Sequence, residues 1–570
     1  MTNGGQFGST PRPLMFCSAL GLVIWTGATW GWEIWHKGGN SLADFLFRTQ
    51  DLPALVMGML GLILCVPFVI AHQQTPVKDG SWALNPRIIL PAILGFALIA
   101  WVGGYFLFHD YALSRDEEVA EMAAAYMHHG MIGWPIPARW EEYRRAIMPE
   151  FFLPYGANHV WASAYLPLNS AFRAFCGWLG DANLSAPILL VIGLAALWRV
   201  AVRLFPDRSD AVAVVMVLAG TSMQLLVTGM TAFAMTGHFA FNMLWLACVL
   251  RDSRWSHVGA GGVALLAAGL HQWHFPLLFL LPFMPWFALQ RRWAVLAFHL
   301  AVLALMVILW GKLWPAYLLQ HLGPPADVLP AAGVADKLGS LFARLDSWHP
   351  LLQMSRFVAW NNLLLVPLAL VAAVTMPWRV ALRGETIVLP LALGAIAVSV
   401  LAMDQGYGWG YRYLHGFIGS LALLAGYGWV RLGHHSLRPV MAAALIALLT
   451  GTFLAKRAQD YVLPYAKSYR AITQSRFDVV LVDPRGGWFV TDVVRGKNGN
   501  PLGHPVVMNI DQLSVGALDR LCDRYSIGVF DQSAFLPLGI GALRWGDSYI
   551  ATLRAHMVER GCGRIIVTAR

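Results

Sequence analysis

Apolar runs long enough to cross a membrane alternate with short polar intervals along most of the chain. The first extends from Leu14 to Trp35, and two more follow near 53–71 and 88–108. Each is near the roughly 20 residues that a membrane-spanning helix needs. Ten further runs are predicted near 183–204, 211–230, 236–250, 257–271, 274–290, 293–311, 357–376, 386–403, 413–431 and 438–455. The pattern predicts an all-α polytopic membrane bundle of about 13 transmembrane helices.

Positive charges between these runs predict which side each loop faces. Arginine and lysine gather in alternate loops, and such loops face the cytoplasm in membrane proteins. These residues are Lys78 with Arg87, Arg199 with Arg203 and Arg208, Arg251 with Arg254, Arg291 with Arg292, Arg379 with Arg383, and Arg431 with Arg438. No signal-peptide cleavage site follows the first run. We therefore expect a multi-pass protein of the bacterial inner membrane with a cytoplasmic N terminus.

Composition agrees with this class. Hydrophobic residues make up 57% of the 570 positions, charged residues only 13%, and the mean hydropathy is +0.56. A typical soluble protein has about a quarter charged residues. The net charge of +10 is spread over short loops, so a nucleic-acid partner is not expected.

The last part of the chain changes character at about residue 456. Short β-rich runs, such as DVVLV, HPVVMNI, SIGVF and GRIIVTA, alternate with helical patterns. This alternation predicts an extracytoplasmic α/β domain over 456–570. Cys522 and Cys562 lie in it, and whether they form a disulfide is left open because pairing needs an oxidising compartment.

One polar interval, 110–182, stands out between the early spans and the bundle at 183–455; the spans before it make up 1–109. It contains Asp110, Asp116, Glu117, Glu118, Glu121, His128, His129 and His159. Charge that hydrocarbon cannot hold lies at a membrane face, as a docking surface or a site of chemistry. Ser114 and Glu117 also fit a capping box, a structural alternative for Glu117. Asp116 shares a helix face with small residues that could simply pack.

Within this interval, 161–179 is long enough to cross a membrane but carries Asn169 and Arg173. Counting it as a span would reverse the side of the arginine-rich loops that follow. We therefore predict a juxtamembrane or re-entrant helix there.

The predicted topology gathers other polar residues on the same outer face. They are His159, His238, His271 and His274, the loop from Lys312 to Arg356, and Asp404, Tyr411 and Arg412. Such convergence of titratable side chains indicates a site. The histidines could instead be interfacial hydrogen bonders, and the aromatics around Trp409 an interface belt. An arginine among glycines and aromatics needs an anion, and a phosphate suits it.

Together these features resemble the GT-C superclass of membrane glycosyltransferases. The resemblance rests on the Asp116-Glu117 pair opening a short helix, the Tyr165-Leu166-Pro167-Leu168 element, the many spans and the C-terminal outer domain. It is similar in kind to protein O-mannosyltransferases and to the aminoarabinose transferases of lipid A. It implies transfer of a sugar from a polyprenyl-phosphate carrier to a glycan, lipid or protein. Two spans precede the usual first one, and His238 stands where relatives often have an acidic residue.

The resemblance assigns roles that fit the residue types. Asp116, with Glu117 second, would be the base that takes the acceptor proton. Arg412, with His271 or His274 and with Lys312 as a further candidate, would stabilise the departing phosphate, and His238 would hydrogen-bond it or the acceptor. His159 and the Tyr165–Asn169 element would close the cavity. No cofactor is required, and a divalent cation stays open.

Two rival classes remain at this stage. A lipid-carrier flippase or solute transporter predicts charges at the bilayer midplane and internal repeats, whereas the ionisable residues here lie at span ends. A non-catalytic envelope assembly factor would use the outer domain for docking alone. Loss of sugar transfer on Asp116→Asn would separate an enzyme from both.

Overall fold

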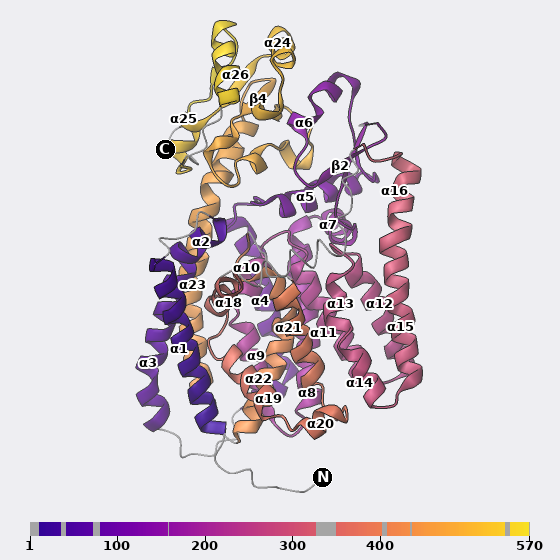
Figure 1. Ribbon diagram of the computed structural model, residues 1–570, viewed down its shortest axis with the longest axis vertical. Coiled ribbons are helices and arrows are strands. Elements are labelled where there is room, and N and C mark those ends of the chain that lie inside the picture. Colours follow the sequence, from indigo (N-terminus) through magenta and orange to yellow (C-terminus); the bar gives the residue numbers. More distant parts are fainter. Residues whose placement is uncertain are drawn as a thin grey trace.

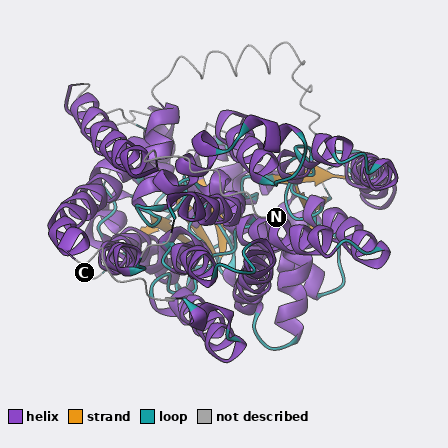
Figure 2. Cartoon of the chain, turned by 90° about the horizontal axis from the view of Figure 1, so that it is seen from below, coloured by secondary structure: helices purple, strands orange, loops and turns teal. Residues whose placement is uncertain are grey.

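A computed structural model describes residues 11–35, 41–71, 80–157, 159–326, 349–401, 407–433, 436–541 and 548–568. A helical bundle forms the lower part of the molecule, and a smaller mixed part lies above it (Figure 1). Seen from below, most bundle helices appear nearly end-on (Figure 2). Cross-bundle packing is extensive, with large buried side chains such as Trp245 and Phe283 near its centre.

The helices of the bundle follow the predicted apolar runs. They are α1 (Pro11–Trp35), α3 (Leu52–Ala71), α4 (Pro86–Phe106), α8 (Ser185–Leu204), α9 (Ser209–Gly220), α10 (Met223–Thr228), α11 (Met235–Arg251), α12 (Arg254–Ala268), α13 (Phe275–Leu280), α14 (Phe283–Leu289), α15 (Trp293–Ile308), α16 (Trp314–Leu322), α18 (His349–Ala359), α19 (Leu365–Thr375), α20 (Trp378–Leu382), α21 (Val388–Leu401), α22 (Ile418–Leu432) and α23 (Arg438–Thr473). Three runs predicted as single spans are broken. One breaks where Ser222 caps α10, one at Pro282, which precedes α14, and one between α18 and α19.

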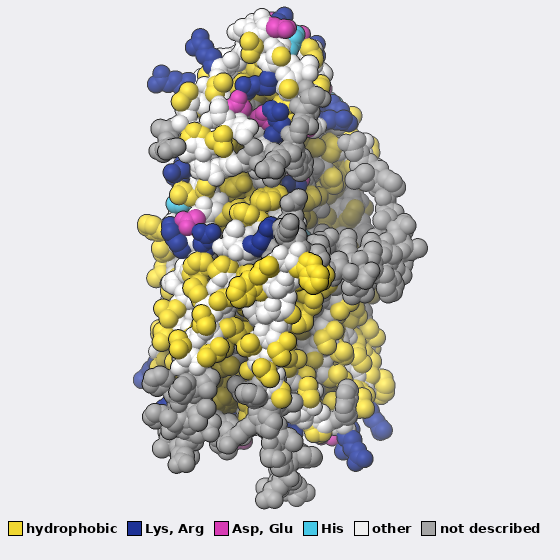
Figure 3. Space-filling model, turned by 60° about the vertical axis from the view of Figure 1, so that its left-hand side comes forward, with side chains coloured by type: hydrophobic (Ala, Val, Ile, Leu, Met, Phe, Trp, Pro, Cys, Tyr) yellow, Lys and Arg dark blue, Asp and Glu magenta, His cyan; other side chains and the backbone are white. Residues whose placement is uncertain are grey.

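The bundle presents apolar side chains outward, as a membrane protein does. On α4, Leu94, Leu98 and Phe106 are 58%, 56% and 73% exposed. Figure 3 shows apolar side chains forming a band below the upper part, with Lys and Arg above it and at its lower edge. Four described helical stretches are long and apolar enough to cross a membrane: Pro86–Phe106, Ala182–Leu204, Trp293–Leu322 and Arg438–Thr473. The protein is therefore a membrane protein, and the count of about 13 crossings stays a prediction.

The polar interval forms a layer on top of the bundle. It comprises α5 (Arg115–His128), β1 (Trp134–Pro135), α6 (Arg144–Ile147), β2 (Phe152–Tyr155), β3 (Val160–Ser163) and α7 (Leu168–Trp178). The strands form an antiparallel sheet in the order β1-β3-β2, with Trp161 opposite Trp134 and Pro154. The predicted helix at 161–179 was wrong at its start, because residues up to Ser163 pair as a strand. At 11 residues, α7 is too short to span a bilayer.

The C-terminal part has the predicted alternation of strands and helices. Its elements are β4 (Val479–Val482), β5 (Val506–Asn509), α24 (Val515–Arg524), β6 (Ile527–Phe530), α25 (Gln532–Phe535), α26 (Ser548–Glu559) and β7 (Arg564–Ile565). The strands form a parallel sheet in the order β5-β4-β6-β7. Cys522 and Cys562 are joined by a disulfide. The predicted boundary at 456 falls inside α23, which continues from the bundle into this part.

One hydrophobic core joins α5 to the C-terminal sheet. Val119, Met122, Ala123 and Tyr126 recur at helical spacing on one face of α5 and pack with residues of β4, β5 and β6. The helix therefore lies between the bundle and the sheet, and its remaining faces carry the carboxyl groups.

Candidate functional site

The start of α5 is built as the sequence predicts. The Ser114 hydroxyl and backbone N–H both donate to Glu117 Oε2, at 3.0 and 3.2 Å, which completes the capping box. Burial raises the pKa of Glu117 to about 7, although both Ser114 bonds oppose the rise. The structural interpretation of Glu117 is thus confirmed, while its suggested role as a second base stays a prediction.

Asp116 lies on a different side of the helix start, between two donors. The Tyr165 hydroxyl donates to Asp116 Oδ1, and Arg412 Nη1 donates to Asp116 Oδ2. The Asp116 and Arg412 side chains are only 14% and 12% exposed. Burial alone would raise the pKa of Asp116, but the Arg412 charge and the Tyr165 bond outweigh it, so the pKa is lowered. The structure thus brings together a carboxylate and an arginine 296 residues apart.

Tyr165 is positioned by the turn between α12 and α13. The backbone N–H of Leu166 donates to His271 O at 3.0 Å, and that of Leu168 donates to Gly269 O at 2.8 Å. A Cβ on Gly269 would lie 2.6 Å from the Leu168 side chain, so this close approach requires glycine. The predicted Tyr165–Leu168 element is therefore fixed against a second part of the site.

Arg412 follows a segment held by buried polar residues that the sequence analysis missed. Gln224 donates from Nε2 to Tyr411 O at 2.6 Å, and Arg356 donates from Nη2 to Gly408 O at 2.5 Å. Arg356 Nε also donates to Asp51 Oδ2 at 2.7 Å, and both of these side chains are fully buried. The available signal was that Asp51 and Arg356 each lie just before a predicted apolar run. From the sequence, the early spans are interpreted as an N-terminal addition. Through Asp51 and Arg356, they hold the segment that presents Arg412.

An aromatic and imidazole wall surrounds the Asp116–Arg412 pair. The rings of His271 and Tyr165 have centroids 4.1 Å apart. Arg412 lies over the rings of Phe233 and Tyr413, at 5.2 and 5.1 Å from their centroids. This wall leaves a cation and a carboxylate in a largely apolar setting.

Phe275 joins the other predicted histidines to this wall. It stacks on Tyr413 with centroids 5.5 Å apart, and its ring lies 5.7 Å from His238 and 5.2 Å from His274. Both nitrogens of the buried His238 ring lack a hydrogen-bond partner among the described residues. The His271 ring lies 5.8 Å from Phe275 as well, so the three histidines meet around one ring, and their role in binding stays a prediction.

Other predicted site residues lie elsewhere. His159 is exposed in the turn between β2 and β3 and lies 2.7 Å from Glu141. Lys312 was predicted to begin a loop, which is wrong: it is an exposed residue of a helical stretch that continues to Leu322. Tyr411 contributes its carbonyl rather than its hydroxyl to the network above. Asp404 lies outside the described residues.

Among the cavities that border α5, two lie on opposite sides of the helix. The one beside Asp116 and Arg412 has a volume of about 20 Å³, with Tyr165, His271 and Phe233 in its lining. The other, about 500 Å³, lies against the residues around Glu118 and Glu121. Across the described residues, no group of three or more His, Cys, Asp or Glu side chains is arranged to hold a metal ion.

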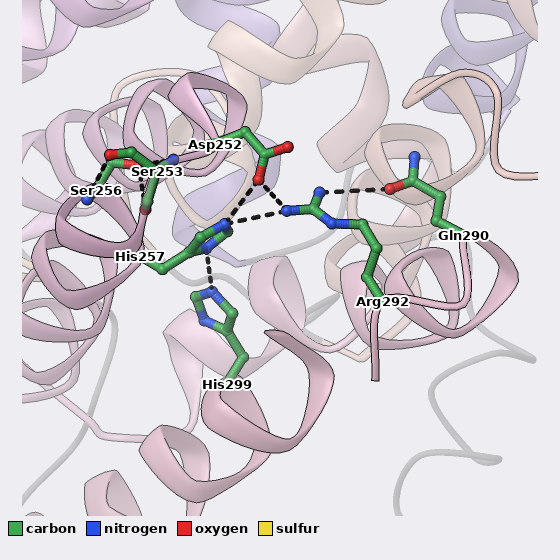
Figure 4. Close-up of polar contacts among 7 residues, drawn as sticks. All are labelled: Asp252, Ser253, Ser256, His257, Gln290, Arg292 and His299. Carbon is green, nitrogen blue, oxygen red and sulfur yellow. Dashed lines mark hydrogen bonds and ion pairs between the residues drawn. The ribbon is translucent and has the colours of Figure 1, made fainter. Parts of the chain in front are cut away.

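A second polar cluster lies at the lower end of the bundle, around the turns before α12 and α15 (Figure 4). His257 Nε2 is 3.2 Å from Asp252 Oδ1, and its Nδ1 is 3.1 Å from His299 Nε2. Arg292 forms an ion pair with Asp252 and also contacts His257. None of these residues lines the two cavities described above.

Fold and site together define an integral membrane protein with a buried acid–arginine pair above a helical bundle. Comparison with protein-family profiles and with curated proteins gives no match. Among solved structures, the chain is similar to ArnT from Cupriavidus metallidurans in the apo state, with 12% identity and a TM-score of 0.46. That match covers 84% of this chain and 88% of ArnT. ArnT bound to undecaprenyl phosphate matches at the same identity and TM-score, over 83% and 89% of the two chains. ArnT is a lipid A aminoarabinose transferase, a GT-C enzyme.

Proposed function

We propose that this protein is a glycosyltransferase that moves a sugar from a polyprenyl-phosphate carrier to an acceptor on the outer face of the bacterial inner membrane. The observation that carries the proposal is the Asp116 carboxylate, held by Tyr165 and Arg412 beside a cavity with an apolar wall. A buried carboxylate next to a cation is what proton removal from a hydroxyl and departure of a phosphate both need.

The chemistry follows from these groups. The acceptor oxygen bonds to the anomeric carbon while Asp116 takes its proton. The bond from that carbon to the phosphate oxygen breaks, and its electron pair leaves with the lipid phosphate, which Arg412 stabilises. If the acceptor is itself a phosphate, no proton must be removed and Asp116 only orients it.

The small size of the cavity implies that the Asp116–Arg412 ion pair opens when the donor binds. At about 20 Å³ it does not hold a sugar phosphate, so the donor has to separate the pair. Arg412 would then turn to the phosphate, and Asp116 would lose the charge that lowers its pKa. Donor binding thereby makes Asp116 a stronger base. His271, whose Nδ1 has no partner among the described residues, is placed to hydrogen-bond the incoming group.

Two observations support an outer location for the site. The Cys522–Cys562 disulfide is typical of an oxidising compartment and lies in the domain that packs on α5. Arginine-rich turns such as Arg291-Arg292 lie at the opposite end of the bundle, as cytoplasmic loops do.

The test is a transfer assay on the purified full chain with a radiolabelled polyprenyl-phosphate sugar and envelope extract as acceptor. Wild type should release the lipid phosphate and label an acceptor, and Arg412→Ala should lower the rate about a hundredfold or more. Unchanged transfer in Arg412→Ala would remove the site assignment. Transport of the intact labelled lipid without cleavage would favour the flippase instead.

A further inference from the structure

A chamber of about 500 Å³ lies on the side of α5 away from Asp116. The end of α4, the α7 helix, α23 and a loop of the C-terminal domain complete its walls. Its volume is within the range of about 300–1,000 Å³ that small-molecule sites have. The loop approaches α5 closely, since a Cβ on Gly499 would lie 3.0 Å from that of Ala125. The chamber is thus shared between the layer above the bundle and the C-terminal domain.

Three buried polar atoms of residues that line this chamber have no hydrogen-bond partner among the described residues. They are Glu118 Oε1, Arg173 Nε and Arg495 Nε. Each of these residues is no more than 5% exposed. A buried polar atom without a partner costs free energy, of the order of 1–3 kcal/mol, unless water or a ligand satisfies it. The lining of the chamber is therefore polar, which favours a polar occupant over an apolar one.

The charges of the lining are balanced, which bears on the class of that occupant. Arg495 lies over the rings of Tyr111 and Tyr469, at 4.2 and 5.4 Å from their centroids, and donates to Ala112 O. Arg173 lies 3.6 Å from Glu121. The cations are already engaged, so a bare phosphate finds no strong excess of positive charge.

The two glutamates extend this balance. Burial raises the pKa of Glu118 well above its usual range and also raises that of Glu121, although nearby arginines oppose both shifts. A carboxyl group accepts hydrogen bonds in either protonation state, and the arginines beside these two glutamates donate them. Mixed donors and acceptors beside tyrosine rings suit the hydroxyl groups and apolar faces of a sugar.

We propose that this chamber binds a neutral carbohydrate, and that this carbohydrate is the acceptor of the transferred sugar. Binding of a carbohydrate is inferred from the chamber alone, while its role as the acceptor rests on the proposed function. A smaller adjoining cavity shares Tyr111 and Glu121 with the chamber and reaches Glu117, the neighbour of Asp116. The chamber and this cavity together extend to the start of α5, and Asp116 lies on the other side of the same helical turn.

The test measures binding and does not require transfer. Purified full chain in lauryldimethylamine oxide, a detergent without a sugar headgroup, is titrated with cellobiose, lactose and mannobiose by calorimetry. At least one disaccharide should bind saturably. Glu118→Ala should weaken binding about tenfold, since it removes hydrogen bonds of that strength, and Glu118→Gln should restore part of it.

Because Glu118 is buried, a second variant guards against misfolding. Asn183→Ala, a half-buried change at the chamber rim, removes contacts with Arg173 and Asp110; it should weaken the same binding and lower the melting temperature by no more than a few degrees. Exposed Glu385→Ala, which does not line the chamber, is the matched control and should bind the sugar as wild type does. The proposal would be overturned if none of the three sugars bound saturably, or if the chamber variants bound them as tightly as wild type does. Binding of inorganic phosphate in place of the sugars would overturn it too. Failure of transfer with intact sugar binding would reject only the proposed function.

Discussion

Two aspartate–arginine pairs, each with histidine nearby, stand at opposite ends of the bundle. Asp116–Arg412 is almost buried, whereas the Asp252 and Arg292 side chains are 59% and 23% exposed. The upper pair borders a cavity, and the lower pair is continued by His257 and His299 into a chain of contacts (Figure 4). Water screens an exposed pair and leaves it worth little, while a desolvated pair keeps a strong local field. The same residue types therefore suit chemistry in one place and local packing in the other.

The largest expected difference comes from the matched change of aspartate to asparagine at both ends. Asp116→Asn should lower the rate of sugar transfer about a thousandfold, because a positioned base contributes about 10²–10⁴-fold. Asp252→Asn should leave the rate within about twofold. Initial rates at saturating donor measure both, with melting temperatures to confirm folding. Equal rates in the two variants would show that the upper pair has no special role.

The second prediction concerns how the free energy of unfolding depends on pH. Next to the upper pair, we expect Glu117 to have the largest effect on it. Burial raises its pKa from 4.5 to about 7 in the folded chain. The folded state then holds the proton more tightly than the unfolded state does. The contribution of Glu117 to the free energy of unfolding is therefore fully present below pH 4.5. It is lost as the pH rises toward 7, by about 3 kcal/mol at most.

The variant Glu117→Gln removes this titration and should flatten the fall in melting temperature between pH 5 and 8. It should also melt higher than wild type at pH 8, since no buried charge forms. Glu385→Gln, at an exposed carboxyl group, is the control. A wild-type melting temperature that rises over this interval would contradict the argument.

Much of this architecture could be predicted from sequence, because hydrophobic period and turn residues are local signals. The four C-terminal strands, the capping box at Ser114 and the meeting of Asp116 with Arg412 all follow such signals or the order of spans. The partners of Arg356 could not be predicted, since Asp51 lies 305 residues away and buried pairs leave no periodic trace. The strand at Val160–Ser163 was missed because an apolar run of that length fits a helix equally well.

A smaller loss of transfer rate is expected from a change at Tyr165. The lower pair has no corresponding tyrosine among its described contacts. Tyr165→Phe removes one hydrogen bond to a carboxylate and keeps the ring against His271. Such a bond is worth about 1.5–3 kcal/mol, and Arg412 still holds Asp116, so we expect about a tenfold loss of rate. The measurement is kcat at several donor concentrations. A loss as large as that of Asp116→Asn would instead make the hydroxyl a reacting group.

The smallest effect should follow from Arg292→Ala in the lower cluster. Arg292 is partly exposed and its partner Asp252 mostly so; pairs of this kind contribute about 0–1 kcal/mol. His257 would keep its contacts with Asp252 and His299, so little buried polarity is left unpaired. We expect transfer within about twofold of wild type and a melting temperature lower by no more than a few degrees. A loss of transfer as large as that of Arg412→Ala, with the fold intact, would mean that the lower cluster affects the reaction from the far end of the bundle. Burial beside a cavity would then not explain the difference between the two pairs.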